Sequence, residues 1–176
     1  MKFLRWYIKV IDQINEKIGY VVSWLTTVMV VIVCYDVFTR YVLKKSSVAV
    51  QELEWHLFAM IFLLGAAWTL KEDKHVRVDV LYTRLSRKQQ AWVNLFGSLV
   101  FLLPFALLVV WTSVNFVKNS YMMGESSPNP GGLPARYILK ACIPAGFLLL
   151  FFEAITLICK SILIIVGKAD DKEIAP

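Results

Sequence analysis

The sequence has few residues of the kinds that build metal centres and catalytic sites. It holds only two histidines and three cysteines in 176 residues. The cysteines lie in or beside apolar runs without metal-ligand spacing, and a haem site would need paired axial ligands where only His56 comes near a span. The sequence also lacks a phosphate-binding glycine loop and a nucleophile elbow. We therefore expect neither an enzyme nor a cofactor in this chain.

Charge is scarce as well. Asp, Glu, Lys and Arg make up 18% of the residues, whereas 58% are hydrophobic and the mean hydropathy is +0.61. A soluble domain of this length could not bury so much apolar surface. The 19 basic residues, which give a net charge of +6, flank the apolar runs. Their partners are therefore expected to be membrane lipids and not nucleic acid.

The uncharged runs predict an all-α integral membrane protein with four transmembrane helices preceded by an amphipathic interfacial helix. The spans are expected at residues 18–36, 53–71, 91–117 and 139–166. Together they form one four-helix domain at residues 18–168. Residues 1–17 repeat apolar side chains every three or four positions, as in a helix lying in the headgroup layer. Residues 169–176 are expected to form a flexible cytoplasmic tail.

Three local signals refine this outline. Ser86 and Gln89 have the spacing of a capping box, which predicts that a helix begins there. Pro104 is expected to disturb the third span near its centre. The segment SSPNPGGLP at residues 126–134 carries three prolines and two glycines, which predict a fixed turn instead of a helix or strand.

The basic residues also predict an orientation. Four Lys or Arg lie in the N-terminal segment, six in the connection after the second span and two in the tail. The other two connections hold three and two or three. By the positive-inside rule, both termini and residues 71–90 are cytoplasmic, and the loop at residues 127–134 is periplasmic.

Charged residues at the ends of the spans are candidates for contacts. Asp36 and Arg40 lie one helical turn apart and can pair with each other, or with a partner chain. Glu52 and Glu54 fall at the start of the second span, where carboxylates need water, headgroups or protein partners.

Three residues stand out within the spans. Gly65 and Ala66 would allow another helix to approach closely. Glu153 lies near the centre of the fourth span, where an ionisable group is a functional candidate by default. Two interpretations are open: a hydrogen-bonded side chain that ties this helix to a neighbour, or the titratable group of a proton or cation relay.

Three segments, in this order, resemble the DctQ-like small permease subunit of tripartite ATP-independent periplasmic (TRAP) transporters. They are DVFTRY at residues 36–41, ELEWHLFAMIFLLGAAWTLKEDKHVRVDVLY at residues 52–82 and SPNPGGLPARYILKACIPAG at residues 127–146. With the four spans and the total length, the resemblance covers nearly the whole chain. Residues 1–17 and those beyond Phe147 match only in hydrophobicity.

The resemblance implies a multi-pass protein of the bacterial inner membrane that acts as a scaffold for a large permease subunit. That subunit carries the substrate and sodium sites, and a periplasmic substrate-binding protein delivers an organic acid. Arg136 is the candidate contact for the delivery protein. The candidates for subunit contacts or helix anchoring are Asp36, Arg40, Glu52, Glu54, Gly65, Ala66, Asp73, Arg77, Asp79 and Glu153.

Other functions remain open from the residues alone. One is an autonomous four-helix exporter, or a proton- or cation-coupled carrier, that uses Glu153. Another is a membrane anchor for a cytoplasmic enzyme. An autonomous carrier would transport its substrate without a larger permease subunit. A membrane anchor would take part in no transport.

Overall fold

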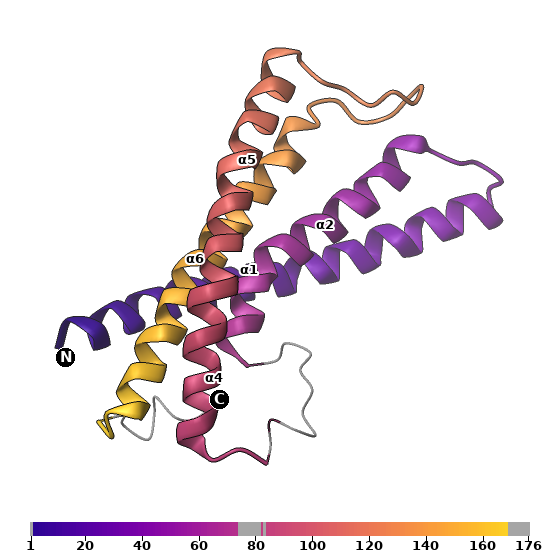
Figure 1. Cartoon of the computed structure of the whole chain (residues 1–176). Helices are drawn as coiled ribbons and strands as arrows, with labels where there is room; N and C mark the ends of the chain where they lie inside the picture. The colour runs from indigo at the N-terminus through magenta and orange to yellow at the C-terminus, as the bar shows by residue number, and fades with distance from the viewer. Residues whose placement is uncertain (1, 74–81, 83, 169–176) are drawn as a thin grey trace.

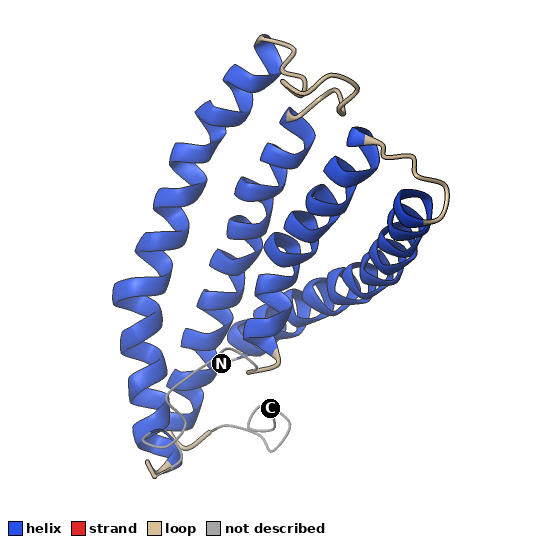
Figure 2. Cartoon of the chain, turned by 90° about the vertical axis from the view of Figure 1, so that its right-hand side faces the viewer, coloured by secondary structure: helices blue, strands red, loops and turns tan. Residues whose placement is uncertain are grey.

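The computed structural model describes residues 2–73, 82 and 84–168, and its secondary structure over these residues is helical (Figures 1 and 2). The helices are α1 (Lys2–Tyr41), α2 (Val48–Lys71), α4 (Arg87–Gly97), the π-helical turn η1 (Ser98–Leu102), α5 (Leu103–Met122) and α6 (Tyr137–Ile165). In this part of the chain, four helical rods are long and apolar enough to cross a membrane: α1, α2, the continuous α4–η1–α5, and α6. The prediction of an all-α chain with four such helices is confirmed.

The four rods lie side by side, with α6 between α5 and α2 (Figure 2). Seen from the side in Figure 2, α5, α6, α2 and α1 follow one another across the molecule. α6 packs against α5 and α4 on one side and against α2 on the other, and α2 packs against α1. The N-terminal half of α1 crosses α6 (Figure 1). Helix α6 therefore contacts every other rod of the bundle.

The structure does not show the separate interfacial helix expected at residues 1–17. α1 is one helix of 40 residues, which corresponds to a length of roughly 60 Å. Its sequence contains no proline, and Gly19 stays inside the helix beside the ring of Trp68. Part of the apolar face of the first turns packs inside the bundle, while Phe3 and Trp6 stay exposed. Ile8 is buried, and its neighbour Tyr7 donates a hydrogen bond of 3.1 Å to the carbonyl of Phe152 on α6.

The third rod contains both local features expected of it. Ser86 accepts a hydrogen bond from the backbone N–H of Gln89, and the Gln89 side chain accepts one from the backbone N–H of Ser86, which confirms the capping box. Ser98–Leu102 then forms a π-helical turn directly before Pro104, the second residue of α5. A proline cannot donate the usual helical hydrogen bond, so an irregular turn at this place has a local cause.

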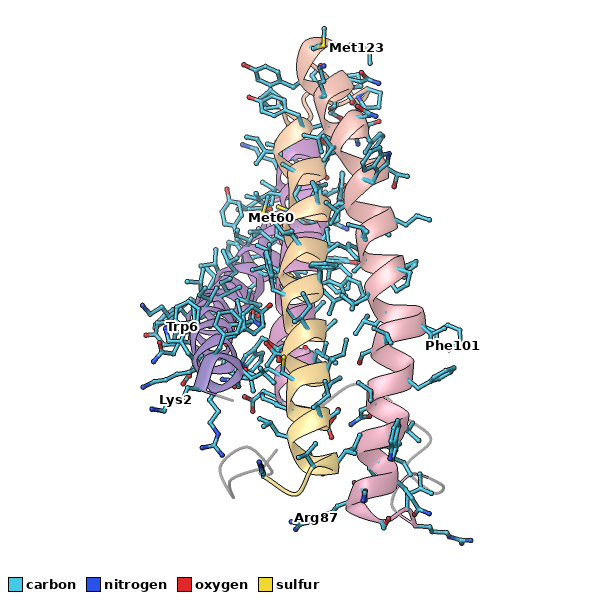
Figure 3. All side chains as sticks on the ribbon, turned by 60° about the vertical axis from the view of Figure 1, so that its left-hand side comes forward. Lys2, Trp6, Met60, Arg87, Phe101 and Met123 are labelled. Carbon is cyan, nitrogen blue, oxygen red and sulfur yellow. The ribbon has the colours of Figure 1, made fainter. Side chains whose placement is uncertain are left out.

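The bundle has two distinct ends. Connections 42–47 and 123–136 lie together at the upper end in Figure 1, which we call the loop end. The start of α1, the end of α2 and the end of α6 lie at the opposite end. Much of the apolar surface faces outward, as the projecting side chains of Trp6 and Phe101 illustrate (Figure 3). Such outer faces suit contact with lipid or with another membrane subunit.

Candidate functional site

Glu153 is buried at the crossing of α1 and α6. The Nδ2 atom of Asn15 donates a hydrogen bond of 2.6 Å to the Glu153 carboxylate. Both side chains are almost completely buried, with exposed fractions of 1% for Asn15 and 2% for Glu153. The most conspicuous carboxyl of the sequence therefore has a partner inside the same chain.

Two ion pairs flank this hydrogen bond. Lys160 Nζ on α6 lies 3.0 Å from the Asp12 carboxylate on α1. Lys71 Nζ, on the last residue of α2, lies 3.5 Å from the Glu16 carboxylate, next to Asn15 in the chain. Glu153 is thus central along α6, as expected, but it sits at the level where α2 ends. We refer to the set of Asp12, Asn15, Glu16, Lys71, Glu153 and Lys160 as the crossing cluster.

A second buried carboxylate organises the loop end. Glu52 on α2 is 3% exposed and accepts hydrogen bonds from three groups of the loop at residues 123–136, here called the outer loop. The donors are the Ser127 hydroxyl, the Asn129 amide at 3.1 Å and the Leu133 backbone N–H at 2.7 Å. Each carboxylate oxygen of Glu52 has at least one donor within the chain. This set of contacts is called the Glu52 anchor below.

Arg136 lies at the junction of the outer loop and α6. The carbon of its guanidinium group is 5.5 Å from the centroid of the Trp55 ring on α2, which is the geometry of a cation–π contact. Its backbone N–H donates to the carbonyl of Glu125 at 3.0 Å. The Lys140 ammonium donates to the Glu125 carboxylate and lowers the pKa of that carboxyl. Arg136, the candidate contact for a delivery protein, therefore contacts both α2 and the start of the outer loop.

The remaining charged candidates are Asp36, Arg40, Glu54, Asp73, Arg77 and Asp79. Asp36 and Arg40 form the ion pair expected from their spacing, with Asp36 only 2% exposed. One carboxylate oxygen of Asp36 and one of Glu54 are buried and accept no hydrogen bond from the described residues. Asp73 follows α2 in a left-handed conformation with φ of 53°. Arg77 and Asp79 lie outside the described residues.

Small residues do mediate close helix contacts, but the tightest lie outside the expected pair. A Cβ at Gly65 would lie 3.4 Å from Val22 on α1, an ordinary contact distance, and Ala66 is half-buried. A Cβ at Gly19 would lie 2.6 Å from the Trp68 ring. A Cβ at Gly146 would overlap the carbonyl oxygen of Leu63, so α2 and α6 touch through their backbones there.

Several functional contacts had only weak signals in the sequence. Asn15 interrupts the apolar face of the first helix, which marks it as a polar residue needing a partner, but nothing local names Glu153 as that partner. Ser127 and Asn129 belong to the predicted turn without any sign that they bind Glu52. Over residues 2–73, 82 and 84–168, no three His, Cys, Asp or Glu side chains gather as a metal site would require.

Comparison with known families identifies a match. The family model described as the DctQ component of tripartite ATP-independent periplasmic transporters matches residues 29–163. The matched part includes the Glu52 anchor and Glu153, while Asp12, Asn15 and Glu16 of the crossing cluster precede it. No curated protein sequence matches the chain.

Proposed function

Because the chain belongs to the DctQ family of TRAP transporter components, we propose that it is the small scaffold subunit of a sodium-coupled importer of an organic acid. The family is one of transporter subunits and not of enzymes, and the chain is a multi-pass membrane protein. Members of the family work with the other TRAP components. In this proposal the large permease subunit carries the substrate and sodium sites, and a periplasmic binding protein delivers the substrate.

The observation that carries the scaffold role is the hydrogen bond from Asn15 to Glu153. A transport site needs convergent polar groups that a substrate or ion can reach. Glu153 is instead engaged by an amide of the same chain and is 2% exposed. This favours a side chain that fixes α1 on α6 over one that meets a substrate.

The outer apolar faces supply the surface that a scaffold needs. Trp24 and Tyr35 of α1, and Leu108 and Trp111 of α5, are each more than half exposed. We propose that part of this surface packs against the large subunit and that lipid covers the rest. Arg40, whose side chain is 43% exposed, is the accessible charged candidate for contacts with that subunit, whereas the unpaired carboxylate oxygens of Asp36 and Glu54 are enclosed within this chain.

The proposed orientation follows from the basic residues. The opposite end, with the start of α1 and the connection after α2, carries most of them and is assigned to the cytoplasm of a bacterial inner membrane. The loop end then faces the periplasm, and Arg136 lies on the side from which a delivery protein approaches.

Uptake by reconstituted components tests the proposal. Proteoliposomes containing this chain and the large subunit, with an inward sodium gradient and the loaded binding protein outside, should accumulate the organic acid. Omitting any one of the three proteins should abolish accumulation. In this proposal the large subunit carries the transport path, the binding protein delivers the substrate, and this chain is the scaffold for the large subunit. Accumulation or proton-driven export by this chain alone would contradict the scaffold assignment.

A further inference from the structure

One side chain of α2, Glu52, contacts three separate positions of the outer loop. Glu52 receives its three hydrogen bonds from positions spread over the loop, at residues 127, 129 and 133. The loop also bonds to itself, from the Ser127 N–H to the Leu133 carbonyl and from the Gly132 N–H to the Asn129 carbonyl, both at 3.0 Å. The carboxylate of Glu52 therefore joins both arms of the turn to α2.

The backbone of the loop is shaped to receive this carboxylate. A Cβ at Gly132 would overlap the Ser127 hydroxyl and lie 2.8 Å from the Glu52 carboxylate, so only glycine fits against the anchor. Gly131 and Ala135, on either side, adopt φ of 77° and 60°. A non-glycine residue such as Ala135 is held in that conformation only when its surroundings determine it.

The loop end exposes apolar side chains beside the outer loop and basic side chains on neighbouring segments. Tyr121, Met122 and Met123 at its start are each about two-thirds exposed or more (Figure 3 labels Met123). The exposed charged side chains at this end are basic, as at Lys44, Lys45 and Lys118. The acidic side chains here are buried or half-buried: Asp36, Glu52, Glu54 and Glu125. This surface suits a soluble protein that presents an acidic docking face.

We propose that Glu52 is a positioning residue: it holds the outer loop as a preformed docking surface for an acidic face of the periplasmic substrate-binding protein. The inference rests on the proposed function, because it assigns that partner to the loop end. A loop already fixed in its bound shape need not be ordered when the partner arrives, so removing the anchor weakens docking without touching the transport path.

Two substitutions disrupt the Glu52 anchor in different ways. Glu52→Ala removes the acceptor of all three hydrogen bonds. Gly132→Ala keeps the carboxylate but places a methyl group between it and Ser127. Gly97→Ala is the matched control, since a Cβ there meets nothing within 4 Å and the site lies on α4, away from the loop.

Hydrogen exchange of the assembled membrane complex, without binding protein, reports the anchor directly. The Leu133 amide should be protected in the wild type and in Gly97→Ala, and should lose protection in both anchor variants, because its acceptor is removed or displaced. Unchanged protection of the Leu133 amide in Glu52→Ala would refute the claim that Glu52 holds the outer loop, whatever the transport result.

Uptake titrated with loaded binding protein reports docking. In both anchor variants the apparent KM for that protein should rise by about tenfold, because the loop must then be ordered when the protein docks, while the maximal rate stays unchanged. The wild-type KM should also rise with ionic strength, and Lys118→Glu should raise it further. An unchanged KM despite lost Leu133 protection would overturn the docking role. Wild-type uptake that needs no binding protein would instead refute the proposed function.

Discussion

Asn15 and Glu153 are 138 positions apart in the chain, yet the amide of one donates a 2.6 Å hydrogen bond to the carboxylate of the other in an almost fully buried contact. The contact joins the first helix to the last. A buried polar group is costly unless it is paired, and here each side chain satisfies the other. Together with the flanking Asp12–Lys160 pair, it fixes the N-terminal half of α1 on α6.

Replacing Asn15 should destabilise the bundle. Asn15→Leu keeps the branching and the number of side-chain heavy atoms but leaves the Glu153 carboxyl buried without its donor, which costs about 1 to 3 kcal/mol. The measurement is the free energy of unfolding of the purified chain in mixed micelles. Gln13→Ala, an exposed change two residues away, is the control and should stay within about 0.5 kcal/mol of the wild type. Equal stability of the two variants would mean that the hydrogen bond contributes nothing.

Glycine-to-alanine changes should rank by the space available to the new methyl group. Gly146→Ala should destabilise by about 1 to 3 kcal/mol, because its Cβ overlaps the backbone of α2 at Leu63. Gly65→Ala should be nearly neutral, since its Cβ meets Val22 at 3.4 Å, whereas Gly65→Leu should overpack this contact and reduce assembly with the large subunit. Gly97→Ala should stabilise by about 0.5 to 1 kcal/mol.

The same unfolding assay ranks the alanine variants, and co-purification reports assembly for Gly65→Leu. The discriminating comparison is Gly146→Ala against Gly97→Ala, two identical changes in helices. If both shift stability by the same amount, the close approach of α2 and α6 is not a feature of the folded protein.

Labelling of single cysteines tests the orientation. In a background without the native cysteines, probes at Ser47 and Pro130 should react with a membrane-impermeant maleimide added outside the cell, because both are exposed at the loop end. A probe at Lys88 should react only after the membrane is opened. Labelling of Lys88 from outside would reverse the topology.

The features that the sequence predicted correctly are local. The capping box of Ser86 and Gln89, the ion pair of Asp36 and Arg40, and the irregularity at Pro104 each depend on residues within a turn or two of one another. The four long apolar helices follow from composition. Such features are encoded by spacing, so spacing reveals them.

The features that the sequence could not predict depend on how the helices cross. Glu52 was identified as a residue that needs a partner, but its donors lie 75 or more positions away. Gly146 was not singled out, because only the path of α2 makes its missing side chain matter. The separate interfacial helix expected at residues 1–17 is not seen for the same reason: part of the amphipathic face that suggested a membrane surface packs on α6.

Transport by a complex carrying Glu153→Gln tests the central claim most directly. The glutamine carbonyl can accept the same hydrogen bond from Asn15 but cannot titrate in a proton or cation relay. We predict that the variant assembles with the large subunit and that sodium-driven uptake of the organic acid proceeds at close to the wild-type rate. Normal assembly with uptake abolished would contradict the scaffold account and make Glu153 part of the transport path.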